Sequence, residues 1–184
     1  ANVQTGAGDV KKAAETSVSL LQKTNASFFV NGGCLSCHHA DMANFAYGVA
    51  LDHGLKVDQS LAEERLTRVL SSSSRGQDLL LQRFDLPGGP ENVAYRLIGL
   101  ASIKYPFDTA MGAAAVNLAG MQNRDGGWRQ VTFARAPMQD SDLTRTALSL
   151  RAIQAYTPPG RKAEFDARIR RAGNLATHHR HNHA

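Results

Sequence analysis

The feature that most constrains this chain is the pentapeptide Cys34-Leu35-Ser36-Cys37-His38, which contains the only two cysteines among 184 residues. Two thiols at this spacing, followed directly by a histidine, form a compact set of reactive groups. Such a set is typical of three kinds of site: covalent attachment of a haem, binding of a zinc ion, or a dithiol redox pair. The surrounding sequence helps to distinguish between them.

The pattern C-x-x-C-H favours the haem. Cys34 and Cys37 can add across the two vinyl groups of a haem, and His38 can then supply a nitrogen ligand to the iron. A thioredoxin-like pair would need a strand-to-helix junction, and the sequence shows no credible strands. A zinc site would need a second ligand pair at defined spacing, which His39 and the C-terminal histidines do not provide. At this motif the chain resembles the c-type cytochromes, which implies one covalent haem c.

The charge balance bears on partners. The formal net charge is +5 at pH 7, which favours acidic partner proteins or surfaces. Lysine and arginine are scattered and form no basic run interleaved with aromatic residues, so we expect no nucleic-acid role. No apolar stretch reaches the length of a transmembrane helix. Because the net charge is positive and the motif indicates a haem, we expect redox partner proteins, acidic ones among them.

The expected compartment follows from the haem. The first residues, Ala1-Asn2-Val3-Gln4, show no signal-peptide pattern. Covalent haem attachment in bacteria takes place outside the cytoplasm. The haem interpretation therefore implies a periplasmic or extracellular protein whose export signal has been removed.

Apolar residues recur at helical spacing along most of the chain, and glycine and proline clusters separate the periodic segments. We expect an all-α domain over residues 10–176, a flexible N-terminal arm over residues 1–9 and a His-rich tail over residues 177–184. The predicted helices cover about residues 10–24, 39–52, 59–70, 77–84, 91–104, 108–121, 142–156 and 162–176.

The helices also suggest an internal repeat. Asn44-Phe45-Ala46-Tyr47 recurs as Asn92-Val93-Ala94-Tyr95, and each copy leads to a chain reversal. An apolar residue and an aspartate then open the next helix, at Val57-Asp58, Phe107-Asp108 and Phe165-Asp166. The period of about 50 residues suits one helical hairpin per repeat. We expect each aspartate to cap its helix or to lie in its first turn as a charge facing the helix dipole, and the haem and the long loops to share one face.

A second resemblance supports this arrangement. The segment from Gln122 to Trp128 resembles the Q-x(3)-G-x-W signature of the squalene–hopene cyclases and related α/α-toroid proteins. It implies a partial toroid of antiparallel helical hairpins over roughly residues 40–176, in which Gln122 and Trp128 tie helix ends together. The segment from Asp140 to Ala147 resembles the region of the cyclase catalytic motif, but Leu143 replaces its last acidic residue. We therefore do not expect cyclase activity.

The remaining candidates concern the haem environment. Met138, in a predicted loop, is the preferred distal ligand, because a loop methionine can reach over the iron. The histidines of the tail, or an open sixth position with water, are the alternatives. Arg83 and Arg129 are the preferred partners of the haem propionates, with Arg96 as a further possibility. His39 cannot reach the opposite face of the same haem.

These observations lead to one main hypothesis and two alternatives. The main hypothesis is a monohaem c-type cytochrome that transfers single electrons outside the cytoplasm, an electron carrier rather than a catalyst. The first alternative is a haem-based sensor or enzyme with an open sixth site. The second is a haem module that assembles by stacking, because the end repeats of a short helical array leave apolar faces uncovered.

Overall fold

The computed structural model describes residues 6–32, 41–84, 88–129 and 141–181. All regular structure in these ranges is helical, which confirms the prediction of an all-α chain. The helices are α1 (Ala7–Gly32), α2 (Met42–Asp52), α3 (Gln59–Leu81), α4 (Gly89–Ser102), α5 (Thr109–Gly120), α6 (Asp142–Ala155) and α7 (Lys162–His181), and a short 3₁₀ helix, η2 (Pro159–Arg161), precedes α7.

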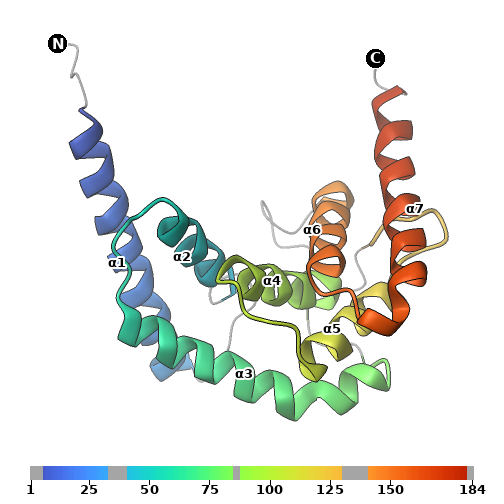
Figure 1. Cartoon of the computed structure of the whole chain (residues 1–184), viewed down its shortest axis with the longest axis horizontal. Coiled ribbons are helices and arrows are strands. Elements are labelled where there is room, and N and C mark those ends of the chain that lie inside the picture. Colours follow the sequence, from blue (N-terminus) through green and yellow to red (C-terminus); the bar gives the residue numbers. More distant parts are fainter. Residues whose placement is uncertain (1–5, 33–40, 85–87, 130–140, 182–184) are drawn as a thin grey trace.

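The helices form an open arc (Figure 1). Helix α4 packs between α2 and α6, and α3 packs along α5 beside this row. Helix α1 contacts α2 and α3, whereas α7 contacts α6. Both ends of the chain therefore lie at the tips of the arc, on the same side of the molecule (Figure 1).

Helices α2, α4 and α6 run in the same direction. Glu91 in the first turn of α4 pairs with Arg145 in the first turn of α6. Lys104, just beyond the end of α4, pairs with Asp52 at the end of α2, with 2.6 Å between Nζ and Oδ1. The start of α4 therefore lies beside the start of α6, and the end of α2 lies beside the end of α4.

The core is centred on α4 and α5. Several side chains of each helix are completely shielded from solvent, and several residues of α5 are alanines, which allow a close approach. Helices α2 and α4 also meet closely at two glycines. A Cβ at Gly48 would lie 2.2 Å from the carbonyl oxygen of Ser102, and one at Gly99 would lie 2.4 Å from that of Asp41. The start of α2 is therefore fixed against α4 through backbone contact.

Polar side chains cap several helices. Asp58 Oδ1 accepts a hydrogen bond from the Leu61 amide (3.1 Å), and Asp108 Oδ1 accepts one from the Met111 amide (2.8 Å). These bonds confirm the capping prediction for two of the three aspartates. The prediction for Asp166 is wrong, because α7 begins at Lys162 and Asp166 instead pairs with Lys162 one turn earlier.

Three helices are longer than predicted. Helix α1 continues to Gly32 because Asn25 and Phe29 still face α2 and α3. Helix α3 runs unbroken through its four serines, since Ser73 Oγ donates to the Val69 carbonyl and packs inside. Helix α7 extends to His181, so part of the predicted tail is helical.

In the described part of the chain, no helix is both long and apolar enough to span a membrane.

Candidate functional site

The haem motif itself is not part of the described structure. Cys34, Cys37 and His38 lie in the gap over residues 33–40, and Met138 lies in the gap over residues 130–140. The structure does define what borders the motif. Helix α1 ends at Gly32, directly before the gap, and Asp41 follows it directly at the start of α2.

Asp41 lies at the centre of a buried charge cluster. Its side chain is 1% exposed and contacts two arginines from different helices. Arg65 of α3 donates from Nη2 to Asp41 Oδ1 at 3.0 Å. Arg96 of α4 places Nε 3.7 Å from Asp41 Oδ2. We call these three residues the Asp41 cluster. It ties the first described residue after the motif to both α3 and α4.

Burial determines the electrostatics of this cluster. Loss of solvent raises the pKa of Asp41 to about 6, against the opposing attraction of Arg96 and Arg65. Burial likewise lowers the pKa of Arg65, with further repulsion from Arg96 and Arg68, and the pairing with Asp41 opposes both effects. Burial also raises the pKa of Tyr47 to about 12. The cluster carries one more positive than negative charge when all its members are ionised.

Several donors in and beside this cluster lack acceptors. Among the described residues, the buried Nε atoms of Arg65 and Arg96 and Nδ2 of Asn44, one turn along α2 from Asp41, have no hydrogen-bond partner, and neither does the acceptor Oδ2 of Asp41. Buried polar groups in folded proteins are normally paired, and an unpaired donor costs free energy. Arg96 Nε and Asp41 Oδ2 face each other at 3.7 Å, so the donors with no nearby acceptor are Arg65 Nε and Asn44 Nδ2.

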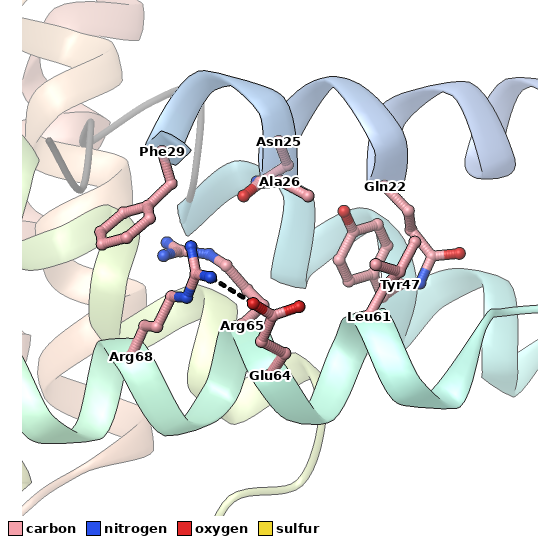
Figure 2. Close-up of a pocket in the computed structure, with 9 residues that line it drawn as sticks. All are labelled: Gln22, Asn25, Ala26, Phe29, Tyr47, Leu61, Glu64, Arg65 and Arg68. Atoms are coloured by element: carbon pink, nitrogen blue, oxygen red, sulfur yellow. Dashed lines mark hydrogen bonds and ion pairs between the residues drawn. The ribbon is translucent and has the colours of Figure 1, made fainter. Parts of the chain in front are cut away.

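The other border of the motif meets the same part of α3. Phe29, three residues before the end of α1, packs against Arg68, whose guanidinium carbon lies 4.0 Å from the ring centre. Arg68 also pairs with Glu64. Figure 2 shows Arg65 and Arg68 extending from α3 toward Phe29, with their guanidinium groups near each other. A cavity of about 10 Å³ lies beside them, which is room for about one water molecule.

The two arginines preferred from the sequence as propionate partners, Arg83 and Arg129, have other contacts. Arg83 follows α3 with a left-handed backbone (φ 63°) and donates from Nη2 to the carbonyl of Gly120, the last residue of α5, at 2.7 Å. Arg129 pairs with Asp125 and lies 3.9 Å from Asp142. Each guanidinium group therefore already has an acceptor, which is the Gly120 carbonyl for Arg83 and the Asp125 carboxylate for Arg129. Their proposed contact with a propionate stays a prediction.

The segment that resembles the cyclase motif is engaged in ion pairs. Arg145 is 1% exposed and pairs with both Glu91 and Asp142. Asp142 is exposed and lies in the first turn of α6, where a carboxylate is favoured by the helix dipole. Ser141 caps this helix by accepting a hydrogen bond from the Thr144 amide at 3.3 Å. In the described part of this segment, the charged groups therefore serve to join α4 to α6.

Gln122 and Trp128 join helices, as the toroid resemblance implies. Gln122 donates to the carbonyls of Gly126 (3.0 Å) and of Arg168 in α7 (2.9 Å). Trp128 is fully buried and donates from its indole nitrogen to the Leu118 carbonyl of α5 at 2.7 Å. Its backbone amide also donates to the Thr146 hydroxyl of α6 at 3.0 Å. These two residues thus connect the end of α5 to α6 and α7.

The Asp41 cluster was not predicted from the sequence. Arg65 occupies a position in α3 between Leu61 and Val69, at the four-residue spacing of a buried helix face. An arginine on an apolar face is a signal of a buried ion pair, but nothing in the sequence identifies Asp41 as its partner. In the described residues, no group of three or more histidine, cysteine, aspartate or glutamate side chains is placed to hold a metal ion.

Comparisons with known proteins add no relative. No protein-family model, no curated protein and no solved structure matches this chain. Its function must therefore be argued from its own residues.

Proposed function

We propose that this chain is a monohaem c-type cytochrome that carries single electrons outside the cytoplasm. The observation that carries the proposal is the motif Cys34-Leu35-Ser36-Cys37-His38. The two thiols would hold the haem through thioether bonds, and His38 would provide the proximal nitrogen ligand. When bound, the haem supplies an iron that changes oxidation state by one electron.

The residues bordering the motif fit such a group. A haem carries two carboxylates, and the Asp41 cluster offers two buried guanidinium groups for only one carboxylate of the chain. Arg65 Nε has no acceptor among the described residues, whereas Arg96 Nε faces Asp41 Oδ2 at 3.7 Å. The chain's own part would be to orient the haem, shield it from water and provide cations for its acidic groups.

We also propose that the helices form a repeat of three hairpins, α2–α3, α4–α5 and α6–α7, as in part of an α/α toroid. The parallel row of α2, α4 and α6 supports this arrangement, with α3 and α5 packed together beside it. The matching caps Asp58 and Asp108 open the second helices of the first two hairpins. Such a frame would present the segments that precede α2, α4 and α6 at one end of the row.

The net charge of +5 supports electron exchange with acidic partner proteins, because opposite charge speeds docking. Export to the periplasm or cell exterior follows from the requirement for covalent haem attachment. Met138 is the proposed distal ligand of the iron.

An absorption spectrum of the purified protein separates the carrier from a sensor or enzyme. We expect a low-spin, six-coordinate haem whose reduced spectrum does not change when carbon monoxide is added. Substitution Met138→Ala should convert it to a form that binds carbon monoxide, whereas Met121→Ala serves as the control. A wild-type haem that takes up carbon monoxide at once would overturn the carrier and favour the open-site alternative.

A further inference from the structure

The row of α2, α4 and α6 carries a groove on the face that α3 and α5 leave uncovered. Every residue that lines this groove belongs to one of the three row helices or directly follows α4. Figure 1 shows the row along the inside of the arc, with α3 and α5 on its outside. The free space in the groove is about 240 Å³. Its principal residues are Phe45, Val49, Ile98, Ala101, Arg151 and Ala155.

The floor of this groove is apolar. Its residues recur at intervals of three and four along each helix, so they form one face of α2, one of α4 and one of α6. Val49 on one side is 42% exposed, whereas Ile98 at the centre is 3% exposed. A cavity of about 150 Å³ between apolar side chains can hold a benzene molecule. The larger groove therefore suits an apolar group of about two fused rings.

Arg151 brings a positive charge to this apolar floor. Its guanidinium carbon lies 5.2 Å from the ring centre of Phe45, so the side chain reaches from α6 across α4 to α2. No carboxylate in the described ranges pairs with Arg151. A guanidinium group has five N–H donors and binds carboxylates through paired hydrogen bonds. Arg151 is therefore placed to receive an anionic group at the edge of the groove.

The other charged groups of the groove offset each other. Lys104 pairs with Asp52, with 2.6 Å between Nζ and Oδ1. The hydroxyl of Ser102 donates to the Ile98 carbonyl at 2.9 Å, so this polar group also has a partner. One surplus positive charge remains, and it belongs to Arg151. The groove thus matches a ligand that combines a single negative charge with an apolar body.

We infer that this groove binds an apolar monocarboxylate of about the size of two fused rings. The carboxylate pairs with Arg151, and the apolar body lies against Val49, Ile98 and Ala101. Removal of these apolar surfaces from water drives binding, and the ion pair orients the ligand. The inference goes beyond the proposed electron transfer and does not rest on it, because every residue that it uses lies in α2, α4 or α6.

NMR titration of the full-length chain tests the site. The probe is β-naphthoate, and uncharged β-naphthamide of nearly the same shape is the comparison, near pH 7 and with any haem kept reduced. The amide signals of Ile98 and Ala101 should shift on addition of either probe. We expect β-naphthoate to bind about tenfold more tightly, because the amide lacks the charge-assisted bonds to Arg151.

Two pairs of variants separate the charge from the groove. Arg151→Met should bring the affinity ratio of the two probes close to one, whereas Arg75→Met, at an exposed position of α3, should leave it unchanged. Ala155→Phe, at the exposed last position of α6, fills the groove and should weaken both probes by about tenfold or more. Gln154→Phe is its control, because Gln154 is equally exposed and does not line the groove.

Four outcomes would overturn the inference. The first is that millimolar β-naphthoate shifts none of the groove signals. The second is an equal affinity for both probes in the parent chain, or a preference that survives Arg151→Met. The third is binding that Ala155→Phe leaves intact. The fourth is a shift of the groove signals when the chain is diluted without any probe, which would show that a second copy covers the groove.

Discussion

Asp41 and Arg65 form a buried ion pair, with 3.0 Å between Oδ1 and Nη2, that joins the first described residue after the haem motif to the second turn of α3. The two residues lie 24 positions apart in the sequence. The pair fixes where the chain resumes after the motif, because Asp41 is also held by Arg96 and by backbone contact with Gly99. The position of any group on the motif therefore depends on these contacts.

Removing Arg65 should destabilise the protein. Arg65→Met leaves Asp41 with one cation in a dry environment, and we expect a loss of about 3–5 kcal/mol of unfolding free energy near pH 7.5. Urea unfolding followed by far-UV circular dichroism measures the change. Arg75→Met, at an exposed position of the same helix, should change the value by less than about 0.5 kcal/mol. Equal effects of the two substitutions would contradict the structural role of the pair.

The pH dependence of stability should reveal Asp41. Burial raises its pKa from 3.8 in the unfolded chain to about 6 in the folded one, so the folded chain binds this proton more tightly. The stability that this carboxyl contributes is fully present below about pH 4 and is lost as the pH rises through about 6. Relative to Asp41→Asn, the wild-type unfolding free energy should fall by about 2–3 kcal/mol between pH 4 and pH 7. A rise over that range would show that the arginines outweigh burial.

Gly99 is a position where a single methyl group should matter. A Cβ there would lie 2.4 Å from the Asp41 carbonyl and 3.2 Å from the Asn44 Cβ. Gly99→Ala must push α2 from α4, and we expect a loss of about 1–3 kcal/mol in thermal or urea unfolding. Gly76→Ala is the matched control, because nothing lies within 4 Å of its Cβ and the position is inside α3. That substitution should stabilise by about 0.5–1 kcal/mol.

Gln122 provides a test of the contacts at the other end of the arc. Gln122→Ala removes donors from the carbonyls of Gly126 and Arg168, and a loss of about 1–3 kcal/mol is expected. Gln154→Ala, at an exposed position of α6, should have little effect. If unfolding curves of the two variants coincide, the bonds from Gln122 do not hold α7 in place.

The sequence predicted the helical class and most helix positions because apolar periodicity and glycine or proline breaks are local signals. It placed the caps at Asp58 and Asp108 because an aspartate before an apolar helix start has a direct physical role. It failed where tertiary contacts override local preference. Helix α3 continues through its serines because Ser73 and Leu80 are buried, and Leu80 offers its carbonyl to Asn117.

In the candidate site, too, the features that depend on neighbouring residues were predicted and those that depend on tertiary contacts were not. The haem motif is visible because its chemistry lies within five consecutive residues. The Asp41 cluster combines side chains from three helices, and no sequence spacing reveals that Arg65 and Arg96 converge on one carboxylate. The choice of Arg83 and Arg129 relied on predicted loop positions alone, and the structure gives both arginines other acceptors.

The most direct test of the account is whether a haem stays attached to the unfolded chain. The protein is produced in cells that export it and attach haem c, then denatured, extracted with acidified acetone and analysed by intact mass and pyridine haemochrome spectrum. We predict one haem per chain that survives extraction and is lost in Cys34→Ser, Cys37→Ser. A chain of unmodified mass, or a haem that extracts freely, would contradict the account.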